Sequence, residues 1–144
     1  MTFGLPRNAI GMKYSTCNNE WELIRFCNKK NTNVLGAASK LLKYFIKNYQ
    51  PKHIYSFADN RWSTPKNNLY NILGFTLTKE SKPGYWYTKN FTERIHRFNF
   101  NKQKLKKLGF DIDNQTEHEI MNSIKYYKVW DCGVSRYELD LKYN

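Results

Sequence analysis

The spacing of apolar and polar residues predicts a strand–helix–strand unit in the first half of the chain. In Glu20–Asn28 neither alternate face is polar throughout, a pattern typical of a strand covered on both sides. Apolar residues then recur at helical spacing over Val34–Asn48, and Pro51 prevents the helix from continuing. His53–Ala58 follows with β-forming side chains. We therefore expect two neighbouring parallel strands joined by a right-handed helical crossover.

Further short elements are predicted downstream. A second helix is expected over Lys66–Leu73, because Gly74 is a natural residue to end it. The alternating runs Phe75–Thr78 and Tyr85–Lys89 flank the turn-forming pair Pro83-Gly84. This arrangement predicts a β-hairpin.

The C-terminal part of the chain predicts two short helices and a terminal hairpin. One helix is expected over Lys102–Leu108, and a second begins after a capping box formed by Thr116 and Glu119. Two alternating runs, Tyr126–Asp131 and Ser135–Leu141, are expected to pair with each other at the end of the chain. A short strand is also expected near the N-terminus.

Composition adds a strong positive charge to this α/β pattern. The 144 residues include 24 Lys and Arg against 12 Asp and Glu, which gives a formal net charge of +12. Such an imbalance favours a polyanionic partner, and nucleic acid is the commonest one. The alternative explanation of the charge is a general bias of the amino-acid composition toward Lys, Asn and Tyr, as an AT-rich genome produces. With 40% hydrophobic and 17% aromatic residues the chain can build a packed core.

Several kinds of site are disfavoured by the sequence. The three cysteines include no CxxC pair, so neither a disulfide framework nor a structural zinc site is expected. The three histidines have no ligand spacing, and no metal is predicted. No signal peptide and no apolar membrane span is recognisable. These observations predict a soluble cytoplasmic protein without a membrane partner.

A basic stretch with interleaved aromatics is the candidate nucleic-acid site. Between Asn90 and Phe110 a single acid, Glu93, stands against many cations. The predicted phosphate-binding residues of this stretch are Arg94, Arg97, Lys102, Lys104, Lys106 and Lys107. Arg61 and Trp62 join this prediction, because they follow the end of a parallel strand, where α/β sheets place ligands. The alternative is an ordinary solvated helix face with core phenylalanines.

A second candidate site is the segment that opens the long helix. Its small residues let the backbone approach a bound group, and a helix N-terminus favours a pyrophosphate. The candidate cofactor-binding residues are Asn33, Val34, Leu35, Gly36, Ala37 and Ala38. Small residues at such a position are also common for packing alone.

Together with Leu69–Phe75, this segment resembles the cofactor-binding half of the GNAT-like N-acetyltransferases. Leu69-Tyr70 followed by Gly74-Phe75 is similar to that family's Leu-Tyr-x-x-x-Gly-Phe signature. The resemblance implies that Val34–Ala38 holds the pyrophosphate of coenzyme A or acetyl-coenzyme A. It also implies that Tyr70 is the general acid that protonates the departing thiolate. Asn33 stands where the family has Gln or Arg, and packing within a short helix is the alternative role for Tyr70.

The family's general base has no clear counterpart near the N-terminus. Met1–Lys13 contains no acid, so only Glu20 and Glu22 on the following strand are left for that role. The alternative is that both acids are ordinary solvent-exposed residues at the edge of the strand.

Nearly the whole chain is similar to one narrower group, the acetyltransferase-like C-terminal regions of phage proteins of homing-endonuclease type. The segments that carry this resemblance include Phe57–Ser63, Tyr85-Trp86-Tyr87 and Asp131-Cys132-Gly133. It implies a phage-encoded protein in the host cytoplasm, without the nuclease part and without the first half of the acetyltransferase fold. Nuclease activity is therefore not expected.

These observations predict an α/β protein with a partial GNAT-like mixed sheet, a βαβ unit and a small basic α+β C-terminal extension. Residues 1–90 form the predicted cofactor-binding half and residues 91–144 the extension with its terminal hairpin. The expected function is that of a DNA-associated module on a degenerate acetyltransferase fold. The alternatives are an active acetyl-coenzyme A-dependent N-acetyltransferase and an interaction module completed by another chain. A homodimer or a complementing nuclease chain is the expected protein partner, with the contact in Met1–Tyr14.

Overall fold

An apolar stripe attaches the long helix to a β-sheet, as the sequence predicts. In the computed structural model, α1 spans Ala37–Tyr49, and Leu42 and Phe45 are its buried residues. Lys40 and Lys43 lie on its exposed side. The structure describes residues 1–7, 19–64 and 66–142.

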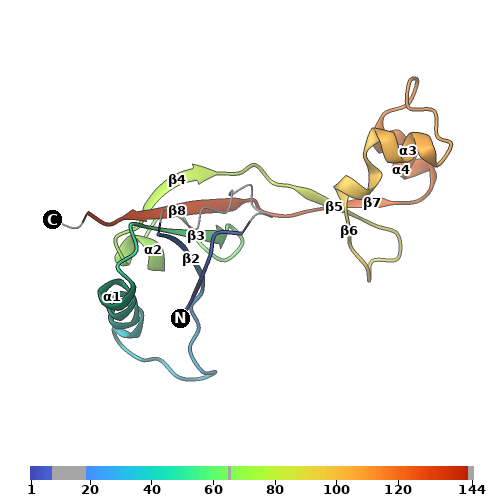
Figure 1. Ribbon diagram of the computed structural model, residues 1–144. Helices are drawn as coiled ribbons and strands as arrows, with labels where there is room; N and C mark the ends of the chain where they lie inside the picture. Colours follow the sequence, from blue (N-terminus) through green and yellow to red (C-terminus); the bar gives the residue numbers. More distant parts are fainter. Residues whose placement is uncertain (8–18, 65, 143–144) are drawn as a thin grey trace. The chain divides into compact units, whose positions relative to one another are not determined.

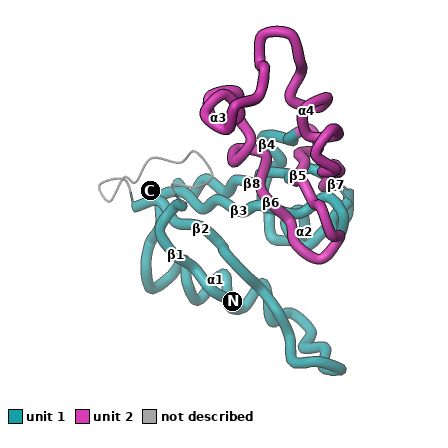
Figure 2. The backbone as a smooth tube through the Cα atoms, turned by 90° about the vertical axis from the view of Figure 1, so that its right-hand side faces the viewer, with its two compact units in different colours: residues 1–81, 133–144 teal, residues 82–132 magenta. Residues whose placement is uncertain are grey.

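The chain divides into two compact units, coloured separately in Figure 2. Unit 1 consists of Met1–Ser81 and Gly133–Asn144, and unit 2 of Lys82–Cys132. Unit 1 contains, in chain order, β1 (Thr2–Gly4), β2 (Glu20–Arg25), α1, β3 (His53–Asp59), α2 (Leu69–Ile72), β4 (Thr76–Glu80) and β8 (Val134–Asp140).

The sheet of unit 1 is mixed and has the strand order β1-β2-β3-β8-β4. β2 and β3 are parallel neighbours joined by α1, so the predicted βαβ unit is confirmed. β1 pairs antiparallel with β2, and β8 lies antiparallel between β3 and β4. The predicted α/β class with a mixed sheet is therefore confirmed.

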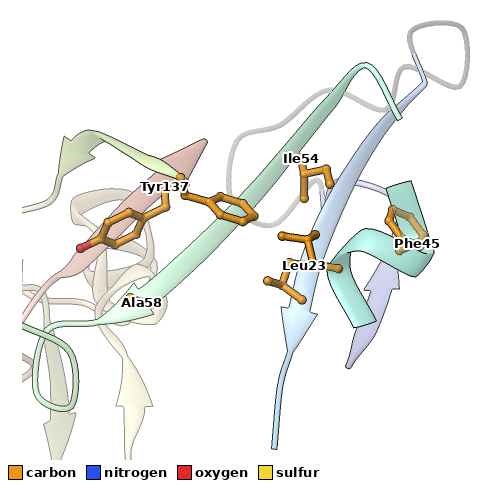
Figure 3. Close-up of a cluster of buried hydrophobic side chains, with 7 residues drawn as sticks. Leu23, Phe45, Ile54, Ala58 and Tyr137 are labelled. Atoms are coloured by element: carbon orange, nitrogen blue, oxygen red, sulfur yellow. The ribbon is translucent and has the colours of Figure 1, made fainter. Parts of the chain in front are cut away.

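The core of unit 1 lies between its sheet and its two helices. Leu23 of β2, Phe45 of α1 and Ile54 of β3 are buried in one cluster, and Tyr137 of β8 extends it (Figure 3). Burying an aliphatic side chain of this size contributes about 1.5–3 kcal/mol. Tyr70 packs against the same cluster, so α1 and α2 cover the same face of the sheet (Figure 1).

Helix α2 is shorter than predicted and begins at Leu69 instead of Lys66. Asn68 caps it by accepting a hydrogen bond from the Asn71 backbone N–H, while the Asn71 side chain accepts from the Asn68 backbone. The side-chain amide of Asn68 also donates to the hydroxyl of Tyr137. The cap therefore fixes both the start of α2 and its contact with β8.

Unit 2 combines a small antiparallel sheet with short helices. Its sheet has the order β6-β5-β7. Its elements are β5 (Tyr85–Thr88), β6 (Ile95–His96), the 3₁₀ helix η2 (Arg97–Phe100), α3 (Lys102–Lys107), α4 (Glu117–Ser123) and β7 (Tyr127–Trp130). The predicted capping box of Thr116 and Glu119 is present at the start of α4.

Both predicted hairpins are wrong. β4 pairs with β8, and β5 pairs with β6 and β7, so β4 and β5 are not partners. Likewise β7 belongs to the sheet of unit 2 and β8 to the sheet of unit 1. The physical reason is that β8 buries Tyr137 in the core of unit 1, which a local hairpin at the chain end cannot do.

The two units also differ from the predicted division at residue 90. Because β8 returns to the first sheet, the basic α+β part is an insertion between β4 and β8. At the other end of the chain, β1 is the short N-terminal strand that the sequence predicts, and it lies at the edge of the sheet formed by the described strands. The segment Asn8–Tyr14 of the predicted self-association contact lies outside the described residues, and that contact stays a prediction.

Candidate functional site

Unit 2 is built around a buried tyrosine that links its sheet to its helices. Tyr87 of β5 is fully buried, together with Leu105 of α3 and Ile120 of α4. The hydroxyls of Tyr87 and Tyr85 both donate to Oε1 of Glu117, at 2.8 and 2.9 Å. Burial, followed by the hydrogen bond to Glu117, raises the pKa of both tyrosines above the ordinary value of 10.0. One carboxylate therefore fixes α4 to β5.

Helix α3 presents four exposed lysines around a single buried residue. Leu105 is completely buried and attaches the helix to the core of unit 2. We call its four exposed lysines, Lys102, Lys104, Lys106 and Lys107, the α3 lysine surface. Within the described residues none of these lysines forms an ion pair.

Local contacts hold α3 without neutralising its charge. Asn101 caps the helix by accepting from the backbone N–H of Lys104, and the Lys104 ammonium donates to Asn99 at 3.3 Å. Lys106 and Lys107 lie in the last turn, where the helix dipole favours cations. The lysines are therefore compatible with the helix while their charge remains available to a partner.

The acids of unit 2 near α4 are engaged locally. Glu117 binds the two tyrosines, and Glu119 accepts hydrogen bonds from the backbone and hydroxyl of Thr116. These bonds lower the pKa of Glu119, so it is ionised at neutral pH. Because both carboxylates lie in the first turn of α4, that helix end is unsuited to face a phosphate, and α3 is the better candidate.

The predicted arginines lie in different environments. Arg94 is exposed in the loop before β6. The guanidinium of Arg97 lies 5.2 Å from the ring centre of Tyr85 and 5.4 Å from that of Phe98, which restrains it by cation–π contacts. Arg61 and Trp62 belong to unit 1, in the turn after β3, and the Trp62 side chain is 82% exposed. The structure thus places the eight predicted nucleic-acid residues on two units.

The turn after β3 is held by hydrogen bonds to Asp59. The Asp59 carboxylate accepts from the backbone N–H of Arg61 at 2.8 Å, and the Asp59 carbonyl accepts from that of Trp62 at 3.0 Å. Such an Asx turn fixes the backbone while leaving both side chains exposed.

The predicted cofactor segment lies at the N-terminus of α1, in unit 1. Residues Asn33–Ala38 line a depression of about 230 Å³ together with Leu69, Ile72 and Leu73. Gly36 is the N-cap residue, with φ of 71°, and no side chain caps the helix. A Cβ atom at Gly36 would meet nothing within 4 Å, so the depression is open above it. The structure thus brings together the two motifs that carried the acetyltransferase resemblance.

Tyr70 packs against the core of unit 1. Its ring stacks on that of Tyr137, with centroids 4.6 Å apart, and makes an edge contact with Phe75. Tyr70 is not among the residues that line the depression. These contacts give Tyr70 a packing role, and its role as general acid stays a prediction.

A polar cluster on the other face of the unit 1 sheet was missed in the sequence. Glu22 of β2 is 1% exposed and forms a salt bridge with Arg7. On β3 and β8, His53 contacts Glu138 with the nearest atoms 3.4 Å apart. Burial, followed by the negative charge and hydrogen bond of Glu20, raises the pKa of Tyr55 to about 12. Alternation along β8, where Arg136 and Glu138 flank the buried Tyr137, was the available signal, but β8 was expected to pair in a terminal hairpin.

Of the two acids considered as a general base, Glu22 is thus occupied by Arg7. Arg7 donates to both carboxylate oxygens of Glu22, at 2.9 and 3.1 Å from Nε. Both carboxylate oxygens of Glu22 are therefore engaged by one guanidinium, and its role as general base stays a prediction.

Comparisons with known proteins give no family assignment. No family model matches the sequence, and no curated protein matches it significantly. None of the helices in the described parts of the chain has the length and hydrophobicity needed to cross a membrane. Residues 1–7, 19–64 and 66–142 also contain no group of three His, Cys, Asp or Glu side chains placed to hold a metal ion.

Proposed function

We propose that this protein binds nucleic acid, primarily DNA, through the α3 lysine surface of unit 2. The observation that carries the proposal is the set of four exposed lysines on one short helix, anchored by Leu105 and without ion-pair partners in the described residues. Lysines contact phosphate as mobile point charges. Phosphate contacts position a protein on nucleic acid without reading its sequence. Binding is therefore expected to depend little on sequence.

The wider proposal is a DNA-associated module on an acetyltransferase-like scaffold, as in phage proteins of homing-endonuclease type. It is supported by the resemblance of the sequence to that group and by the net charge of +12. The parallel β2–α1–β3 unit expected from the resemblance also supports it. In this proposal unit 1 is the scaffold and unit 2 carries the DNA contact.

The direct test compares lysine-to-glutamine variants on the two units. The variant Lys102→Gln, Lys106→Gln and Lys107→Gln removes three charges from α3 while keeping good helix formers. Its matched control carries Lys40→Gln, Lys43→Gln and Lys47→Gln on the exposed side of α1. Fluorescence anisotropy with two duplexes of unrelated sequence measures the affinity. We expect the α3 variant to lose roughly 100-fold at low salt for both duplexes, and the α1 control to lose much less. Equal losses in both variants would refute an interface on α3.

A second candidate function is supported by the depression at the start of α1. We propose there the binding of coenzyme A or acetyl-coenzyme A, with the pyrophosphate against the backbone of Val34–Ala38. The support is that both sequence motifs line one depression and that the helix end carries no side-chain cap. Transfer of an acetyl group to an amine would further require Tyr70 as general acid.

The role of Tyr70 is tested by Tyr70→Phe. The ring stack on Tyr137 is kept in this variant, so the stability should change by less than about 0.5 kcal/mol. A chain that transfers acetyl groups should become slower by roughly 10²-fold or more if the hydroxyl protonates the thiolate. An unchanged turnover rate would leave Tyr70 with its packing role alone.

A further inference from the structure

A pocket in unit 2 combines aromatic side chains with cations. It has a volume of about 390 Å³, within the range of roughly 300–1,000 Å³ typical of small-ligand sites. All of its lining residues belong to unit 2, so its shape does not depend on unit 1. The lining residues that matter here are Lys82, Trp86, His96, Arg97, Phe98 and Asp131. We call it the Trp86–Phe98 pocket.

Its aromatic side chains form a continuous series held by the sheet. Trp86 of β5 and His96 of β6 are paired across the strands, and their rings meet edge to face at 4.7 Å. The His96 ring then contacts the Phe98 ring, also at 4.7 Å, and its Nδ1 accepts from the Phe98 backbone N–H. Phe98 is 64% exposed and Trp86 37% exposed. The pocket thus offers exposed ring surface on a fixed backbone, which suits stacking by a planar group.

The charged side chains that line the pocket favour a nucleotide over an inorganic phosphate. The Arg97 guanidinium lies over the Phe98 ring, and Lys82 also lines the pocket. Asp131 adds a carboxylate, fixed by a 2.7 Å hydrogen bond that its Oδ1 accepts from the Gly84 backbone N–H. An inorganic anion would be repelled by this carboxylate. A nucleotide places its base, with amino groups that donate to an acceptor, apart from its phosphate, so the base can approach the carboxylate while the phosphate approaches the cations.

We propose that the Trp86–Phe98 pocket binds one unpaired base of single-stranded nucleic acid. The base stacks on the exposed ring of Phe98, and the adjoining phosphate lies near Arg97 and Lys82. This inference rests on the proposed nucleic-acid function and adds a preference to it. The α3 lysine surface binds phosphates of either form, whereas the pocket takes a base only where it is not paired.

The test compares Phe98→Ala with a matched change outside the pocket. Phe91→Ala is the control, because Phe91 is 78% exposed in the same unit, stacks on Tyr127 and does not line the pocket. The probes are a labelled oligodeoxycytidylate of about 12 nucleotides, whose bases carry an amino group and whose length is within the usual range of such sites, and a duplex of the same length. Phe98→Trp keeps a stacking surface and serves as the conservative variant.

We expect Phe98→Ala to lose about 5- to 100-fold in affinity for the single strand, the scale of one stacked base. Its duplex affinity should stay within about twofold of the wild type, which also shows that unit 2 remains folded. Phe98→Trp and Phe91→Ala should keep single-strand binding. Equal losses of Phe98→Ala on both probes would overturn the base preference of the pocket. No effect on either probe would overturn the pocket while leaving duplex binding by α3 intact. A wild-type chain that binds neither probe would overturn both proposals.

Discussion

The hydroxyl of Tyr87 donates a 2.8 Å hydrogen bond to Glu117, which joins the central strand of the unit 2 sheet to the first turn of α4. Tyr87 is completely buried, so its hydroxyl depends on this one carboxylate for a partner. The position of α4, and with it the core that supports Leu105 and α3, therefore depends on Glu117.

Removing this acceptor should destabilise the protein. Glu117→Ala leaves the buried Tyr87 hydroxyl without its partner, which costs about 1–3 kcal/mol of the free energy of unfolding. Glu117→Gln retains an acceptor oxygen and should lose less. Urea denaturation measures both. The control is Glu93→Ala, an exposed acid of the same unit, which should change stability by less than about 0.5 kcal/mol.

A double variant separates the hydrogen bond from other effects of the substitution. Adding Tyr87→Phe to Glu117→Ala removes the orphaned hydroxyl, so part of the lost stability should return. Strictly additive losses would show that the two residues are not coupled.

Stability should fall at alkaline pH because of Tyr55. Its pKa is raised to about 12 from the ordinary value of 10.0, first by burial and then by Glu20. Between these two values the folded chain keeps the proton that the unfolded chain loses, so stability is full below pH 10.0 and decreases as the pH rises toward 12. Urea denaturation from pH 8 to 11 should show this decrease. In Tyr55→Phe the slope of the unfolding free energy against pH should be smaller, by the equivalent of at most one bound proton. The exposed Tyr44→Phe serves as control and should leave the slope unchanged.

The cofactor proposal makes a prediction at Gly36. Gly36→Glu places bulk and negative charge above the helix N-terminus and should abolish binding of acetyl-coenzyme A. The control Gly36→Ala shares the unfavourable positive φ, but its methyl group enters open space, so binding should persist. Calorimetry measures the affinity of both variants for acetyl-coenzyme A. If the wild type binds no cofactor at millimolar concentration, the motif has a packing role only.

Periodicity predicted the parts of the fold in which neighbours in sequence are neighbours in space. The βαβ unit follows from the stripe of α1 and from two flanking strands, and the structure has it. The pairing of β4 with β8 was not predictable in the same way, because alternation defines the faces of a strand but not its partner. The turn signal at Pro83-Gly84 favoured a local hairpin, whereas burial of Tyr137 determines the observed arrangement.

The sequence predicted the candidate sites that are formed by consecutive residues, but not those that depend on strand pairing. Exposed lysines and a small-residue helix start are visible as local runs, and the structure has both. The Trp86–Phe98 pocket needed the pairing of β5 with β6, which joins residues that sequence order keeps apart. The salt bridge between Arg7 and Glu22 likewise depends on how the N-terminal segment meets β2.

The measurement that tests nucleic-acid binding most directly is the salt dependence of the affinity for duplex DNA. Six phosphate contacts, from the α3 lysine surface with Arg94 and Arg97, predict a slope of about −5 in log K against log salt concentration. The variant Lys102→Gln, Lys106→Gln and Lys107→Gln should weaken this slope by about 3, and the matched α1 variant Lys40→Gln, Lys43→Gln and Lys47→Gln should leave it near −5. A slope that the α3 variant leaves unchanged, or that the α1 variant weakens instead, would contradict the account.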